Sequence, residues 1–162
     1  MSNSGCCGTG SKAGTKSKIN SFSIEARADD KYKVAVKAGE RTLYVDQPLF
    51  AGGTDAGANP MEYLFASLAG CLATTARIIA AQQNLDLKGM DIKVEGSFDL
   101  AIMYGKSRES RPGLTGINVS VALDSAMSEM ERQGFFEELR SRCPISDTIA
   151  AATPITMTAV EA

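Results

Sequence analysis

The segment that most constrains the fold is the long apolar run "NPMEYLFASLAGCLATTARIIAAQQN", residues 59–84. Asn59 is a residue type that caps helices, and Pro60 suits the first helical turn because its φ is already helical. The spacing of the apolar residues predicts a helix that stops between Asn84 and Gly89. A chain with one such helix is expected to build its core around it.

The two faces of this predicted helix differ in the size of their side chains. Small residues let a second backbone approach closely, so we expect a central helix, buried all round and packed against a second helix of the same chain or of a second subunit. Cys71 lies at the boundary between the face with large side chains and the face with small side chains. The large face carries Met61, Leu64, Phe65, Leu68, Leu72 and Ile79, and the small face carries Ala66, Gly70, Ala73 and Thr74.

Alternating apolar and polar residues predict strands on both sides of this helix, and helical spacing returns towards the C-terminal end. Ser128 and Glu131 have the spacing of a capping box. Grouped strands and long helices indicate an α+β domain rather than repeated βαβ units. The predicted strands are 19–28, 31–38, 40–46, 90–103, 115–124 and 154–160, and the two further helices are 125–142 and 144–153.

Length and charge describe an ordinary globular chain of 162 residues with a net charge of −2. It is long enough for one domain, expected at 19–162, preceded by a flexible Gly-, Ser- and Lys-rich tail at 1–18. No basic excess points to nucleic acid, and Glu62 and Arg77 make the long helix a poor membrane span. The tail has no apolar signal-peptide core, so we expect a cytoplasmic protein whose thiols stay reduced.

The sequence contains no histidine and four cysteines. This excludes Ser-His-Asp and Cys-His nucleophile pairs and His-ligated metals within the chain. The cysteines lack CxxC spacing, so we expect no metal and no cofactor. Cys6 and Cys7 lie in the expected tail, where exposed thiols, a transient metal site and chance all remain open.

Cys143 precedes Pro144, which places it at the N-cap of the short predicted helix. The positive end of that helix, with Arg140 and Arg142 nearby, is expected to lower the thiol pKa. The alternative is that Cys143 is only a small apolar cap. Cys71 taken alone is better explained as a small core residue, since free cysteines are among the most buried types.

Two segments taken together, "GANPMEYLFASLAGCLATTARIIA" and "RCPISDTIAAATPITMTAV", resemble the OsmC/Ohr family of thiol-dependent peroxidases and their OsmC-like relatives. The resemblance extends over nearly the whole chain after residue 18. It implies an intertwined α+β homodimer, with antiparallel sheets around long central helices. It also implies that Cys71 is the thiol that attacks peroxide and that Cys143 resolves the oxidised product.

The resemblance further implies an arginine and a glutamate that activate the first cysteine. Arg27 matches the arginine position best and Arg41 is the second choice. The glutamate position holds Met61, and the adjacent Glu62 points away from Cys71 on the same helix because nine helical steps separate them.

The sequence therefore leaves two functions open. The first is a peroxidase that reduces small organic hydroperoxides and is recycled by a dithiol, with a lipoyl-type group as the expected class. The second is a non-peroxidatic thiol protein that binds or carries a small reactive sulfur species or an electrophile. The Cys71–Cys143 pair with Arg27 favours the first, which we rank ahead, whereas Met61 and the extra cysteines favour the second.

Overall fold

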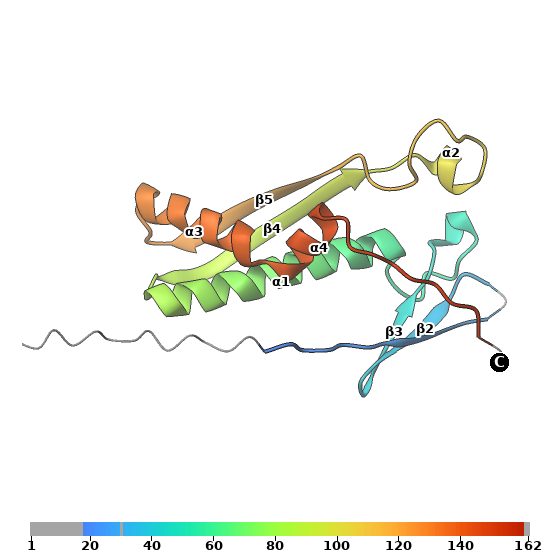
Figure 1. The fold of residues 1–162 in the computed structure, drawn as a ribbon, viewed down its shortest axis with the longest axis horizontal. Coiled ribbons are helices and arrows are strands. Elements are labelled where there is room, and N and C mark those ends of the chain that lie inside the picture. The colour runs from blue at the N-terminus through green and yellow to red at the C-terminus, as the bar shows by residue number, and fades with distance from the viewer. Residues whose placement is uncertain (1–17, 30, 161–162) are drawn as a thin grey trace, which may run out of the picture.

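The computed structural model of the chain describes residues 18–29 and 31–160. The expected tail, with Cys6 and Cys7, lies outside these residues except for Lys18. Two separate antiparallel sheets are present, one with the order β1-β2-β3 and one formed by β4 and β5. Along the chain the elements are β1 Glu25–Ala28, β2 Val34–Ala38, β3 Arg41–Val45, the 3-10 turn η1 Leu49–Ala51, α1 Pro60–Gln83, β4 Leu87–Ser97, α2 Leu100–Met103, β5 Gly116–Ser125, α3 Glu129–Arg142 and α4 Pro144–Ala150 (Figure 1).

Helix α1 begins and ends where the sequence predicts. The Asn59 side chain accepts hydrogen bonds from the backbone N–H groups of Met61 and Glu62 at 2.9 and 3.0 Å. Glu62 in turn accepts the N–H of Asn59 at 2.7 Å, which completes a capping box. The helix stops at Asn84, whose left-handed backbone (φ 53°) is the usual C-terminal geometry.

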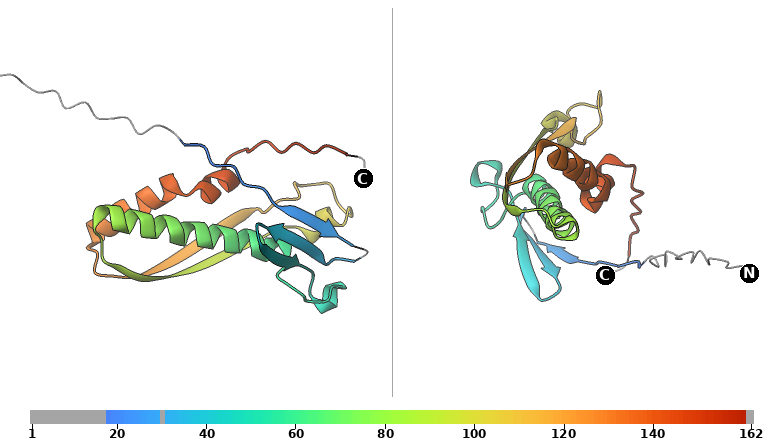
Figure 2. Two further views of the ribbon diagram at one scale, coloured as in Figure 1. Left: turned by 90° about the horizontal axis from the view of Figure 1, so that it is seen from below. Right: turned by 90° about the vertical axis from the view of Figure 1, so that its left-hand side faces the viewer.

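The helices pack against one face of the long hairpin β4–β5. Its antiparallel register runs from Leu87 opposite Ser125 to Ser97 opposite Gly116, with one irregularity near Gly89. Helices α1, α3 and α4 cover one face of this hairpin (Figure 2). The core between them is built from Leu68, Leu72, Ala76, Ile79, Ala80, Leu87, Met127, Phe135, Leu139 and Cys143.

The loop between β3 and α1 is folded around the carboxylate of Asp46, which is 1% exposed. That carboxylate accepts hydrogen bonds from the hydroxyl and N–H of Thr54 and from the N–H groups of Gln47 and Ala56. These bonds, the Thr54 hydroxyl first, lower the Asp46 pKa to about 2 against the opposing effect of burial. A Cβ on Gly57 would lie 1.8 Å from the carbonyl oxygen of Tyr44, so this loop admits only glycine there.

Three predicted strands differ from the structure. The first pairs only over Glu25–Ala28, because its partner β2 ends at Ala38 and leaves residues 19–24 nothing to pair with. The strand predicted to run through residue 103 ends at Ser97, and α2 follows because the Asp99 side chain caps it by accepting the N–H of Ala101. Residues 154–160 form no strand, and Ile155, Met157 and Val160 are exposed.

Helix α1 is not buried all round within the one chain. Its large face behaves as predicted, with Leu68, Leu72 and Ile79 in the core. On the small face, Ala66, Gly70 and Thr74 are exposed. The helix is long and apolar enough to cross a membrane by length and composition alone, and it packs against β4, α3 and α4.

Candidate thiol site

Cys71 and Cys143 meet in the core although 72 positions apart in sequence. Cys71 lies midway along α1 and is partly exposed, whereas Cys143 is 1% exposed at the junction of α3 and α4. Both are free thiols. The Cys71 side chain packs against the cluster that contains Cys143 and lies close enough to affect its titration.

Cys143 occupies the N-cap of α4, as the Cys-Pro pair predicts. The expected lowering of its pKa is wrong, because burial raises the pKa of this thiol. The neighbouring Cys71 raises it further, and the N–H groups of Ser146 and Ile145 lower it only in part. These N–H groups face the sulfur, but the Cys143 side chain makes no full capping hydrogen bond to the helix. The structure therefore favours the protonated thiol at Cys143.

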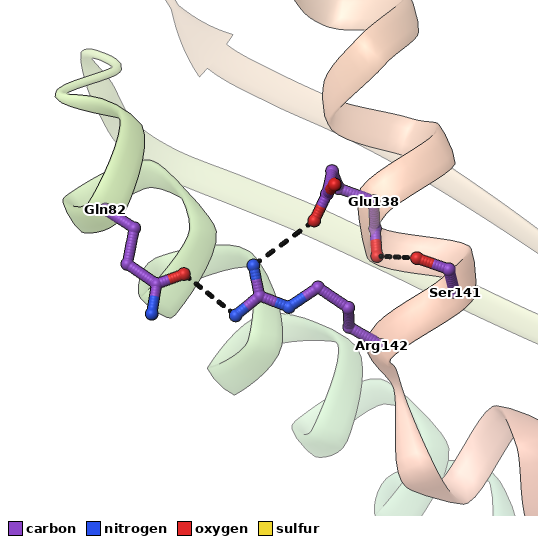
Figure 3. A network of polar contacts seen from close by, with 4 residues as sticks. All are labelled: Gln82, Glu138, Ser141 and Arg142. Carbon is purple, nitrogen blue, oxygen red and sulfur yellow. Dashed lines mark hydrogen bonds and ion pairs between the residues drawn. The ribbon is translucent and has the colours of Figure 1, made fainter. Parts of the chain in front are cut away.

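The two arginines that precede Cys143 lie in different surroundings. Arg142 donates to Glu138 at 3.3 Å and to Gln82 of α1 at 2.8 Å, which joins α3 to the end of α1 (Figure 3). Arg140 is exposed and lines a hollow bounded by Leu68 and Ser146. Arg142 thus helps to hold α3, and hence Cys143, against α1.

Arg27 is not brought to Cys71 within the one chain. It lies in β1, its side chain is 87% exposed, and its Nε donates to Asp29 at 3.3 Å. Arg41, the second choice, is exposed in β3 of the same sheet, which lies near the N-terminal end of α1 (Figure 1). An activating arginine from this sheet would have to come from a second copy of the chain.

Glu62 and Met61 have distinct places in the structure. Glu62 is held in the capping box of α1 by the N–H of Asn59, and so has a structural role. Met61 is partly buried and lines a hollow beside β5. Neither residue supplies a carboxylate to Cys71. Among the residues that the structure describes, no group of three or more His, Cys, Asp or Glu could hold a metal ion.

Sequence reasoning missed Arg111, which lines the same hollow as Met61. It lies in the polar segment "SRESRPGL", where an arginine gives no local sign of a binding role. The only sequence feature that could have drawn attention to Arg111 is Gly113, two residues later, whose missing side chain leaves room for the Arg111 guanidinium. A Cβ there would lie 2.7 Å from one guanidinium nitrogen.

The fold is shared with solved bacterial proteins of low sequence identity. An OsmC-like protein from Mycoplasma pneumoniae is 21% identical, with 83% of this chain and 91% of that chain covered and a TM-score of 0.72. The organic hydroperoxide resistance protein OsmC from Legionella pneumophila is 20% identical, with 82% of this chain and 91% of that chain covered and a TM-score of 0.62. The organic hydroperoxide resistance protein OhrB of Bacillus subtilis is 18% identical, with 82% of this chain and 93% of that chain covered and a TM-score of 0.55.

No curated protein matches the sequence. A family model described as OsmC-like protein does match, over residues 53–158, from the Asp46 loop through α1, the hairpin and both cysteines to the C-terminal segment. The match covers well over half of the chain and agrees with the structural neighbours. The chain belongs to the OsmC-like protein family.

Proposed function

We propose that the protein is a thiol-dependent peroxidase that reduces small organic hydroperoxides. The observation that carries the proposal is the meeting of Cys71 and Cys143, both free, within one core cluster. The naming of related folds as organic hydroperoxide resistance proteins supports the substrate class. The different environments of the two thiols support a division of roles, with the more exposed Cys71 meeting the peroxide first.

The proposed chemistry has three steps, and each of them balances. The Cys71 thiolate attacks the O–O bond of the hydroperoxide, becomes a sulfenic acid, and releases the alcohol after proton transfer to the alkoxide. The Cys143 sulfur then displaces the sulfenic hydroxyl, which leaves as water with the Cys143 proton, and a disulfide forms. An external dithiol, of lipoyl type, reduces this disulfide by exchange and is itself oxidised to a disulfide. A cytoplasmic location suits this recycling, since thiols there are kept reduced.

The proposal includes a homodimer built on α1. The exposed Ala66, Gly70 and Thr74 leave one face of the helix without a partner among the residues that the structure describes. Arg27 is exposed in β1 and its Nε donates to the exposed Asp29, and its other N–H groups would approach the Cys71 thiol of the second copy, where the charge would stabilise the thiolate. Its fork of N–H donors would also bind a peroxide oxygen.

Consumption of cumene hydroperoxide with dihydrolipoate as the reductant tests the proposal. The unmodified protein should turn over, and Cys71→Ser should lose turnover altogether. Cys143→Ser should consume about one equivalent of peroxide per thiol and then slow, because no neighbouring sulfur resolves the sulfenic acid. Arg27→Ala should slow the first step more than Arg41→Ala does. Equal rates in the unmodified protein and in Cys71→Ser would exclude the peroxidase.

One observation favours a second function, a non-peroxidatic carrier of a reactive sulfur species or an electrophile. Within the described chain, the side chains of Arg27, Arg77 and Arg142 bond to groups other than Cys71, and Glu62 is held in the capping box. A thiol without an adjacent activating charge is suited to slow adduct formation. Mass spectrometry separates the two functions, because a carrier would accumulate a Cys71 adduct from polysulfide or maleimide while leaving peroxide unconsumed.

A further inference from the structure

Large apolar and aromatic side chains are exposed at one end of the molecule. They come from the segment 31–33 before β2, from the 3-10 turn η1 and from helix α2, which all lie at the same end of the long axis (Figure 1, Figure 2). Single exposed apolar residues are common, but several at one end mark a surface that binds a partner or a membrane. The exposed residues are Tyr32, Leu49, Phe50, Leu100, Met103 and Tyr104.

The turn η1 has a well-supported backbone although its side chains are exposed. A Cβ on Gly53 would lie 1.8 Å from the carbonyl oxygen of Gln47, so the chain closes tightly behind the turn. The Tyr32 ring lies against Gly52, where a Cβ would be 3.2 Å from the Cε2 atom of the ring. The loop around the buried Asp46 carboxylate therefore presents the apolar residues of η1 from a fixed base, with Tyr32 beside them.

Both projections pair backbone N–H groups with their own carbonyl groups. In η1 the N–H groups of residues 51–53 donate to the carbonyls of Pro48 and Leu49. At the end of α2 the N–H groups of residues 104–107 donate to the carbonyls of residues 100–102. A segment that enters the apolar edge of a bilayer needs such internal pairing, because lipid tails offer no acceptor. The pairing favours a lipid surface over a protein partner, whose polar groups could satisfy free N–H groups.

Cationic side chains follow the apolar residues of α2. The segment between α2 and β5 contains Lys106, Arg108 and Arg111 but only one acidic residue, Glu109, in a chain whose net charge is −2. None of these cations forms an ion pair with another described residue, and the Nζ of Lys106 lies 5.8 Å from the centre of the Tyr104 ring. Apolar side chains with cations beside them are complementary to a bilayer that carries anionic headgroups.

We propose that this end of the molecule docks onto an anionic lipid surface, with Leu49 and Phe50 of η1 and Leu100 and Met103 of α2 entering the edge of the bilayer. The contact is peripheral and leaves α1 in the protein core. It goes beyond the proposed peroxidase activity, because none of these side chains takes part in the thiol chemistry.

Tryptophan fluorescence tests the insertion, because the sequence contains no tryptophan and a single introduced one reports on one position. Phe50→Trp and Met103→Trp should shift their emission to shorter wavelength, and be quenched by brominated acyl chains, on vesicles of equal parts phosphatidylcholine and phosphatidylglycerol. Vesicles of phosphatidylcholine alone should have a much smaller effect. Met130→Trp, at an exposed position of α3 towards the other end of the molecule, is the control and should show neither change (Figure 1). The absence of a shift in Phe50→Trp and Met103→Trp, an equal shift in Met130→Trp, or equal effects of the two kinds of vesicle would overturn the proposal.

Cosedimentation of the full chain with the anionic vesicles measures the apolar contribution. Phe50→Ser should weaken binding by about tenfold or more, since an apolar side chain of this size gains that much on leaving water, and Met130→Ser should leave binding unchanged. Cys71→Ser should bind as the unmodified protein does, so that a failure of docking and a failure of the peroxidase can be told apart. Equal binding of Phe50→Ser and the unmodified protein would contradict the proposal. So would a loss of self-association in Phe50→Ser without vesicles, measured by light scattering, because this end would then be a subunit contact.

Discussion

At Cys143 two physical effects act against each other. The start of α4 presents backbone N–H groups that stabilise a thiolate, while burial removes the water that a thiolate needs. A helix end can be recognised from a Cys-Pro pair. The burial of Cys143 comes from a core cluster that includes Leu68 and Leu72 of α1, which are far from Cys143 in the sequence. The position of the cysteine could therefore be predicted, and the sign of its pKa shift could not.

The first prediction concerns alkylation of this thiol. Because its pKa is raised, Cys143 should react with iodoacetamide more slowly than an ordinary cysteine at neutral pH, and its rate should rise only at alkaline pH. Cys71→Ala should lower the Cys143 pKa, since Cys71 contributes to raising it. Labelling across pH, followed by mass spectrometry of the peptide, measures both effects. Rapid labelling of Cys143 at neutral pH would contradict them.

The second prediction concerns Asp46 and acid stability. Its pKa falls from 3.8 to about 2 on folding, so the ionised form is favoured in the folded protein. The stability that it contributes is complete above the ordinary value of 3.8 and is lost as the pH falls towards 2. Asp46→Asn should lower the Tm at neutral pH and flatten the Tm profile in that acid range.

Asp55→Asn is the matched control for Asp46. Asp55 lies in the same loop, is exposed, and has a left-handed backbone (φ 56°) that asparagine also adopts. Its substitution should leave the acid profile of the unmodified protein in place. If both variants lose the same acid dependence, the loop as a whole and not the buried carboxylate is responsible.

Among the elements, those that depend on local chemistry could be predicted and those that depend on distant partners could not. Helix α1 follows from Asn59, Pro60 and the periodicity between them and Asn84. In residues 98–103 an alternating pattern suggested a strand, but the Asp99 cap stabilises a helical turn instead. Residues 154–160 have strand composition without a strand beside them in the chain. Arg111 was missed because only the folded chain brings it to the hollow that Met61 also lines.

The third prediction tests how α3 is fixed to the core. Phe135 is fully buried between α1 and the hairpin, and its ring meets that of Phe136 edge to face, with centroids 5.9 Å apart. Phe135→Ala should destabilise the protein by about 3–5 kcal/mol through lost burial and a cavity. Met130→Ala, at an 84% exposed position of the same helix, should stay within about 0.5 kcal/mol. Urea unfolding at a fixed protein concentration measures both, and equal effects would contradict this packing.

The fourth prediction belongs to the whole molecule and its proposed dimer. A Cβ on Gly70 meets nothing within 4 Å in the described part of the single chain, so Gly70→Leu should not strain the subunit. It should improve the helix by up to about 1 kcal/mol through propensity. In a dimer that packs on this face the added side chain has no room, and light scattering should show dissociation.

Gly134→Leu provides the comparison for Gly70. Gly134 is also a helical glycine with open space at its Cβ, and it lies on the outer side of α3. That variant should keep the mass of the unmodified protein. A monomeric mass for the unmodified protein, or a dimer that survives Gly70→Leu, would exclude an assembly on this face of α1.

Strands β4 and β5 should stay paired even when the chain is cut in the segment that connects them. Its strands pair over ten residue positions, while the segment between them carries the exposed Lys106 and Arg108. Tryptic cleavage there would divide the molecule into one piece with α1 and β4 and another with β5, α3 and α4. The backbone ladder and the core between α1 and α3 would continue to join the two pieces. Size-exclusion chromatography of the nicked protein should therefore show a single species, and the two halves expressed separately should reassemble as complementary fragments.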